Sequence, residues 1–235
     1  MIRLNKYLAD CGVCSRREAD RLIGDGRVQV NGNLADMGCR VTETDKVTVD
    51  GKNLAGKNTP VVLAFYKPVG VTCTEKDKHA EKIVNDYIKY PVRVTYAGRL
   101  DKESEGLLLL TNDGKLIDAM MRGANGHEKE YVVKVNKEIT GEFLKKMGAG
   151  VYLRELSVKT RPCKIERIGK YTFRIILTQG LNRQIRRMCK ELGYGVVQLK
   201  RERVMNIKLG KLTPGCYRKV TGEELEKLYQ LAKED

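Results

Sequence analysis

The sequence lacks any apolar run long enough to cross a membrane, which takes about 20 consecutive apolar residues. Its first residues, MIRLNK, also lack the apolar centre of a secretory signal peptide. The seven cysteines are odd in number and scattered, so reduced thiols are expected rather than a disulfide framework. These absences predict an intracellular, cytoplasmic protein with no membrane partner.

The sequence also lacks a complete set of ligands for zinc. Cys11 and Cys14 form a C-x-x-C pair, but no second pair of cysteines or histidines completes a site, so a redox or metal role is the weaker alternative. A zinc base deaminase would need an H-x-E and a P-C-x-x-C motif. His79 begins H-A-E and Cys163 follows a proline, but Glu166 stands where the second cysteine belongs. We therefore predict no metal.

No internal repeat or low-complexity tract is present, and a chain of 235 residues suits a small domain followed by a medium one. Residues 51–60 are small and polar, with two glycines and a final proline, as in a linker. We predict a first domain at residues 1–50, a linker at 51–60 and a second domain at 61–235.

Acidic residues are scarce in one late segment of the chain. The whole sequence has 45 basic and 30 acidic residues, a net charge of +15. Residues 161–220 contain sixteen basic and three acidic residues, a net charge of +13, whereas residues 1–50 contain eight of each. This asymmetry predicts a binding surface for a polyanion, either a nucleic acid or an acidic membrane surface.

The first domain begins with two short helices and a hairpin. Ser15-Arg16-Arg17-Glu18 matches a capping box that opens a helix ending near Gly24. Arg17 and Arg21 lie four residues apart on this helix, with Arg16 beside them. Val28-Gln29-Val30 alternates into Asn31-Gly32, a strong signal for a hairpin turn.

This pattern of a Ser-Arg-Arg helix before a Val-x-Val-Asn-Gly hairpin resembles the S4 RNA-binding domain. The resemblance covers about fifty residues and implies that Arg16, Arg17 and Arg21 contact RNA. The alternative is that these arginines form only a solvated helix face.

The second domain mixes helices and strands without a regular βαβ alternation, which predicts an α+β fold with a mixed or antiparallel sheet. Strands are predicted at residues 61–66, 94–97, 107–110, 130–135, within 156–178, and at 196–199, 205–209 and 217–220. Helices are predicted near residues 83–88, 115–122, 141–148, 183–188 and 222–233.

Three groups in this domain can carry chemistry. The first is Asp101, which lies in a loop between two apolar strands, close to Arg99 and between two glycines. The second is Tyr131 on an alternating strand, and the third is the basic helix at residues 183–187. Each also has an ordinary structural interpretation: a turn cap, a core residue and an exposed basic face.

The chemistry of these groups is complementary. An arginine beside a carboxylate favours the ionised form, and an ionised aspartate can act as a nucleophile or base. An aromatic ring can stack on a base that has left its helix. A glycine turn at the start of a basic helix offers backbone amides and positive charge to phosphate.

Together these segments resemble the pseudouridine synthases of the RsuA/RluB/RluE/RluF group, over almost the whole chain. The matching segments are Lys67-Pro68-Val69-Gly70, Gly98-Arg99-Leu100-Asp101, Lys129-Glu130-Tyr131 and Arg183-Gln184-Ile185-Arg186-Arg187. The resemblance implies that Asp101 is the nucleophile, Tyr131 the active-site tyrosine and Arg186 the partner of Asp101. It also implies that Arg99, Arg183 and Arg187 contact RNA, and Arg99 is a candidate to fill the gap left by the flipped base.

The same resemblance implies isomerisation of uridine to pseudouridine without a cofactor. Residues 127–131 and 203–206 are most similar to the RluF branch, which points to a uridine of large-subunit (23S) rRNA and to a monomeric enzyme. Asp101 would attack C6 of the base or act at the sugar through a glycal-type route. The alternative function is a non-catalytic rRNA-binding or ribosome-assembly protein, which would have no use for a carboxylate beside phosphates.

Overall fold

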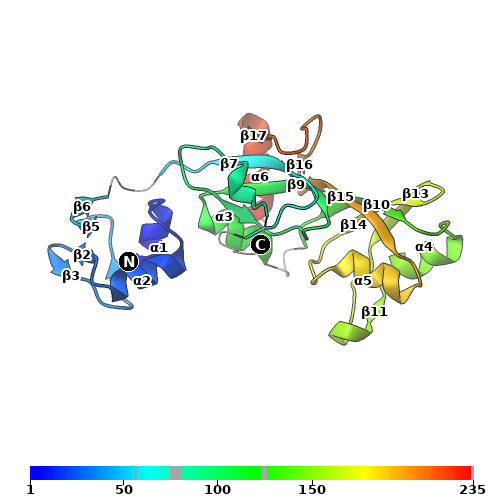
Figure 1. The fold of residues 1–235 in the computed structure, drawn as a ribbon, viewed down its shortest axis with the longest axis horizontal. Coiled ribbons are helices and arrows are strands. Elements are labelled where there is room, and N and C mark those ends of the chain that lie inside the picture. Colours follow the sequence, from blue (N-terminus) through cyan, green and yellow to red (C-terminus); the bar gives the residue numbers. More distant parts are fainter. Residues whose placement is uncertain (55, 57, 75–80, 123–125, 234–235) are drawn as a thin grey trace. The chain divides into compact units, whose positions relative to one another are not determined.

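The computed structural model describes residues 1–235 apart from residues 55, 57, 75–80, 123–125 and 234–235. The described chain divides into two compact units (Figure 1). The first contains Met1–Val61 with two short later segments, Tyr90–Thr95 and Asn112–Gly114, and the second contains the rest. No described helix is long and apolar enough to span a membrane.

The first unit packs two helices against small sheets. Its helices are α1 (Leu4–Asp10) and α2 (Arg16–Gly24), and its strands are β1 (Ile2–Arg3), β2 (Val28–Val30), β3 (Asn33–Leu34), β4 (Arg40–Val41), β5 (Val47–Val49) and β6 (Lys52–Asn53). The hydroxyl of Ser15 accepts a hydrogen bond from the Glu18 amide at 3.2 Å and so caps α2. Asn31 and Gly32 both have positive φ, as the predicted tight hairpin turn between β2 and β3 requires.

The second unit is built around a nine-stranded sheet formed by its described residues. The strand order is β13-β14-β10-β15-β9-β7-β17, and β16 and β8 add to β15 and β9. The strands are β7 (Val62–Lys67), β8 (Thr95–Ala97), β9 (Glu105–Thr111), β10 (Lys129–Val135), β13 (Lys164–Gly169), β14 (Thr172–Leu177), β15 (Val196–Val204), β16 (Ile207–Lys208) and β17 (Tyr217–Lys219). The β9–β15 pairing is parallel, whereas β10–β15 and β7–β9 are antiparallel, so the predicted mixed sheet is confirmed.

Helices cover this sheet in two groups (Figure 1). The first group is α3 (Gly114–Met121) and α6 (Gly222–Lys233), and the second is α4 (Gly141–Gly148) and α5 (Gln184–Glu191). The core under α3 and α6 includes Val62, Ala64, Leu107, Leu109, Leu116 and Leu228. The core under α4 and α5 includes Val133, Phe143, Phe173, Ile175, Ile185 and Leu199. A small hairpin of β11 (Tyr152–Leu153) and β12 (Val158–Lys159) lies beside α5.

One cross-strand row links the four central strands. Lys67 pairs with Gly106, Gly106 with Arg201, and Arg201 with Tyr131. Because paired residues share a face and successive residues alternate, this row lies opposite Leu107, on the face that carries α4 and α5. A Cβ atom on Gly106 would lie 2.3 Å from the Arg201 carbonyl oxygen, so only glycine permits this close parallel pairing.

The structure also departs from the predicted elements in places. Lys52–Asn53 forms β6, so the first unit's sheet extends into the predicted linker. Strand β15 runs without a break from Val196 to Val204, longer than predicted, because its pairing with β10 supports it along its length. The helix predicted near residues 83–88 is a single 3-10 turn, Val84–Asp86.

We expect Gly106→Ala to destabilise the second unit strongly. Gly210 also has a positive φ, but a Cβ atom added there would meet no atom within 4 Å, so Gly210→Ala isolates the cost of the backbone angle alone, about 1 kcal/mol. The Arg201 backbone adds a steric clash at Gly106 that cannot relax through a side chain. Urea unfolding midpoints should therefore fall much further for Gly106→Ala. Equal shifts for the two variants would contradict the close approach.

Candidate active site

The loop at residues 98–104, here called the Asp101 loop, is held by backbone contacts on both sides of Asp101. The Leu100 amide donates to the buried Cys73 sulfur at 3.5 Å. The Gly70 amide donates to the Lys102 carbonyl at 2.8 Å, which ties the Asp101 loop to the turn after β7. The Asp101 side chain keeps 31% of its surface exposed. A fixed but accessible carboxylate is what a nucleophile needs.

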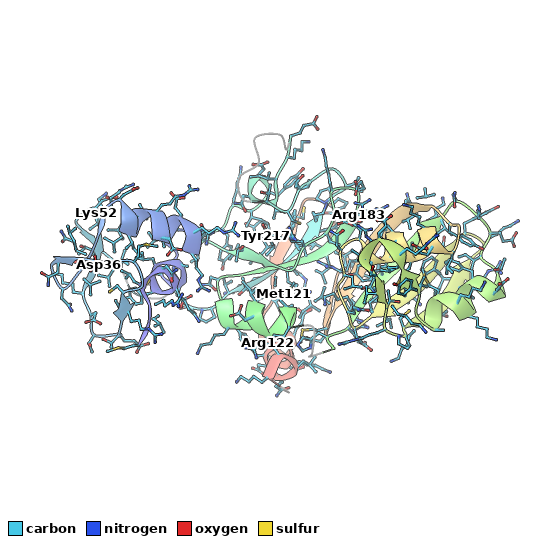
Figure 2. All side chains as sticks on the ribbon, turned by 90° about the horizontal axis from the view of Figure 1, so that it is seen from below. Asp36, Lys52, Met121, Arg122, Arg183 and Tyr217 are labelled. Carbon is cyan, nitrogen blue, oxygen red and sulfur yellow. The ribbon has the colours of Figure 1, made fainter. Side chains whose placement is uncertain are left out.

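Two arginines approach the Asp101 carboxylate from the start of α5. Nη1 of Arg183 lies 3.8 Å and Nε of Arg186 lies 4.0 Å from its Oδ2 atom (Figure 2 labels Arg183). Arg183 also pairs with Glu103 at 2.8 Å. Nη2 of Arg186 donates to the Glu103 carbonyl at 3.0 Å and to the Ser104 hydroxyl at 3.2 Å. The predicted pairing of Asp101 with Arg186 is thus at the outer limit of an ion pair, with Arg183 as a second cation.

The local sequence explains how α5 presents these cations. Arg183 is the N-cap of α5 in the left-handed conformation, with φ 50° and ψ 34°. The Leu181 amide donates to the Gln184 side chain at 3.0 Å, which closes the turn before the helix. The apolar face of α5 is buried in the second core through Ile185, Met188 and Cys189. Arg186 therefore lies at the edge of that core, with 15% of its side chain exposed and its Nε atom without a hydrogen-bond partner among the described residues.

Lys67 is a buried cation below the Asp101 loop. Its Nζ atom donates to the carbonyls of Pro68 and Val71, both at 2.8 Å. Burial lowers the pKa of Lys67 from 10.5 to about 8, and the nearby Cys73 and Asp101 partly oppose that shift. The Lys-Pro turn of the sequence is thus a charged, hydrogen-bonded support for the site.

Tyr131 lies in the same row of the sheet, half-buried on β10. It pairs with Arg201 on one side and with Ile175 on the other. The register shifts between Glu130 and Tyr131, and Arg203 binds Glu130 across this bulge at 2.9 Å. The pairing places Tyr131 opposite Arg201, on the same face of the sheet as Lys67.

Comparison with known proteins identifies the family. Residues 61–191 match the family model for RNA pseudouridylate synthase, and residues 2–47 match the S4 domain. The chain is 46% identical to the dual-specificity RNA pseudouridine synthase RluF of Escherichia coli O6:H1, over 98% of this chain and 79% of that relative. The chain belongs to the RNA pseudouridine synthase family.

Two further relatives agree. Ribosomal large subunit pseudouridine synthase B of Bacillus subtilis is 39% identical, over 99% of this chain and 97% of that protein. A crystal structure of a pseudouridylate synthase superposes with a TM-score of 0.72 at 27% identity, covering 97% of this chain and 100% of that one. The predicted group, the S4-like unit and the α+β fold are therefore confirmed.

Two of the arginines predicted to contact RNA differ in their surroundings. Arg99 is exposed, and no hydrogen bond or ion pair between the described residues joins its side chain to Asp101. Arg187 is bound within the protein, because it donates to Asn182 and forms an ion pair with Glu155. Arg186, which the family resemblance implies as the partner of Asp101, lies beside it together with Arg183.

The arginines predicted on the first unit are exposed on α2. Arg16, Arg17 and Arg21 are exposed, and Arg21 forms a long ion pair with Glu18 at 3.4 Å. Cys11 and Cys14 pack against the core of this unit, and burial raises the pKa of Cys14. His79, part of the rejected deaminase motif, lies outside the described residues.

Sequence reasoning missed Arg201, Glu103 and Cys73. Arg201 lies in a run of four charged residues, Lys-Arg-Glu-Arg, that suggests a solvated strand. Its burial follows from the central position of β15, which the sequence does not reveal. The excess charge of residues 161–220 is also partly neutralised by acids elsewhere in the chain: Arg203 binds Glu128 and Glu130, and Arg218 binds Glu224.

We expect the lowered pKa of Lys67 to make the free energy of unfolding of the wild type rise as the pH increases from about 8 to 10.5. Lys67→Met should lack this increase. In that window the unfolded lysine still holds its proton while the folded one has lost it, so the unfolded state binds more protons. Urea unfolding of both proteins across this pH range measures the increment. Lys219→Met, which changes an exposed lysine on β17, should keep it. A wild-type pH dependence in Lys67→Met would contradict the lowered pKa.

Proposed function

We propose that this enzyme isomerises a uridine of large-subunit (23S) rRNA and that Asp101 is its catalytic residue. The observation that carries the proposal is an accessible carboxylate fixed by its loop and flanked by Arg183 and Arg186. The name of the Bacillus subtilis relative, a ribosomal large subunit pseudouridine synthase, supports the choice of substrate. The reaction breaks the N1 glycosidic bond, turns the base and joins C5 to the sugar, so it needs no external co-reactant.

In this proposal, the Asp101 carboxylate attacks C6 or acts at the sugar, with Arg183 and Arg186 beside it. The target uridine must leave its stack to reach a carboxylate at this depth. Tyr131 then offers its ring to the flipped base from the row beside the Asp101 loop, and exposed Arg99 is positioned to fill the gap.

RNA binding is shared in this proposal between the two units. The exposed Arg16, Arg17 and Arg21 of α2 contact RNA in the first unit, and Arg183 contacts phosphate near the reacting base in the second. The domain limits at 1–50, 51–60 and 61–235, the monomeric state and the cytoplasmic location stay predictions.

The substrate is tested by incubating the enzyme with unmodified 23S rRNA and 16S rRNA and mapping pseudouridine chemically. Modification at a discrete site in 23S rRNA alone supports the proposal. Modification only in 16S rRNA would contradict the choice of subunit. Tight binding without any pseudouridine would favour the alternative, a non-catalytic rRNA-binding or ribosome-assembly protein.

Asp101→Asn should abolish pseudouridine formation, by at least about a thousandfold, and leave RNA binding intact or slightly tighter. The substitution keeps the size of the side chain but removes a negative charge that repels phosphates. Single-turnover assays and a filter-binding titration measure the two effects. Glu103→Gln, which removes a more exposed charge from the same loop, should keep measurable turnover. An Asn variant with a rate near that of the wild type would show that Asp101 is not catalytic.

Salt dependence should separate Arg183 from Arg187. Arg183 is partly exposed and its partners are surface carboxylates, so Arg183→Ala should reduce the slope of log Kd against log salt by about 0.7 to 0.9. Arg187 is engaged with Glu155 and Asn182, so Arg187→Ala should change the slope less. Equal and full reductions would mean that RNA displaces the Glu155 contact and that both arginines bind phosphate, as the sequence alone predicted.

A further inference from the structure

Arg201 is the most deeply buried arginine close to the active site, with 3% of its surface exposed. Its Nε atom donates to the Leu107 carbonyl at 2.7 Å, and its Nη1 atom donates to the Arg99 carbonyl at 3.4 Å. These two carbonyls lie on either side of Asp101 in the sequence. One guanidinium on β15 therefore holds both ends of the segment that carries the carboxylate.

The backbone of Arg201 makes a second contact with the same segment. It pairs in parallel with Gly106, so close that a Cβ atom at position 106 would overlap the Arg201 carbonyl. The two donors and the glycine contact together fix the start of β9, which directly follows the Asp101 loop. Lys67 supports the neighbouring turn from the next strand in the row.

Stability alone does not account for an arginine at this position. A buried guanidinium loses its hydration, and replacing buried charge with an apolar side chain of similar size often stabilises a protein. No ion pair between described residues offsets the charge of Arg201, and its Nη2 atom has no hydrogen-bond partner among them. A guanidinium can donate from separate nitrogen atoms to two carbonyls in different parts of the chain, whereas a lysine has a single donor nitrogen.

We propose that Arg201 is a positioning residue that sets the place of Asp101 by joining the Arg99 and Leu107 carbonyls. This proposal rests on Asp101 being the catalytic residue. Arg201 does not contact the RNA, because its guanidinium is enclosed by the sheet and the Asp101 loop. Its loss moves the carboxylate relative to the flipped uridine, and a displacement of about 1 Å can reduce a rate by about a hundredfold.

The test compares Arg201→Met and Arg201→Lys with a matched control, Arg218→Met. Arg218 lies on the edge strand β17 of the same sheet and binds Glu224 and the Lys208 carbonyl, so its loss removes a bound guanidinium far along the sheet from the Asp101 loop. Each variant is measured by single-turnover rate at saturating enzyme, RNA affinity, and hydrogen exchange of the peptides that cover residues 99–107.

We expect Arg201→Met to lower the single-turnover rate about a hundredfold, to change the Kd for rRNA less than about twofold, and to speed hydrogen exchange at residues 99–107. Arg201→Lys should recover part of the rate because it can still bind one carbonyl. Arg218→Met should keep the wild-type rate and exchange at residues 99–107. If Arg201→Met does not fold, Arg201→Lys tests the proposal by itself. It should then show a smaller loss of single-turnover rate, with faster hydrogen exchange at residues 99–107.

Wild-type rate and exchange in a folded Arg201 variant would overturn the proposal. An equal loss in Arg218→Met, or a loss of RNA affinity that accounts for the lower rate, would also overturn it. Hydrogen exchange is independent of turnover. The wild-type enzyme could modify no rRNA uridine while Arg201→Met still speeds hydrogen exchange at residues 99–107. In that case the proposed function is wrong, but Arg201 still holds the Asp101 loop in place.

Discussion

The parallel contact between Gly106 on β9 and Arg201 on β15 is the constraint on which the site depends. It joins the half of the sheet covered by α3 and α6 to the half covered by α4 and α5. Without this contact, no pairing between described strands would join the half of the sheet that carries the Asp101 loop to the half that carries the cations of α5. The close approach requires glycine at position 106. The Arg201 side chain then donates to the carbonyls of Leu107 and Arg99, on either side of Asp101.

The positions of Tyr131 and of the α5 arginines follow from this pairing of β9 with β15. Strand β15 pairs with β9 on one side and with β10 on the other, so Tyr131 enters the same row as Gly106. Helix α5 directly precedes β15 in the chain and packs on the face that this row occupies. Arg183 and Arg186 therefore reach the Asp101 loop, although about eighty positions separate them from it in the sequence.

The sequence predicted the parts that are specified locally. The Ser15 cap, the Asn31-Gly32 turn and the loop between two apolar strands each depend on a few neighbouring residues, and the structure contains all three. It could not predict the strand order, and so it could not show that Arg201 is buried. Through the family resemblance it implied Arg186 as the partner of Asp101, but it did not indicate that Arg183 lies beside the same carboxylate.

Cations of two kinds lie around the Asp101 loop, and they differ in whether a phosphate can reach them. Lys67 and Arg201 are buried and bound to carbonyls, so they are not accessible to a phosphate. Arg183 is exposed and pairs with Glu103, which is itself largely exposed. A phosphate can therefore replace Glu103 as its partner at little cost, since an exposed ion pair contributes little free energy. The buried cations thus hold the Asp101 loop in place, while Arg183 beside it is accessible to a phosphate.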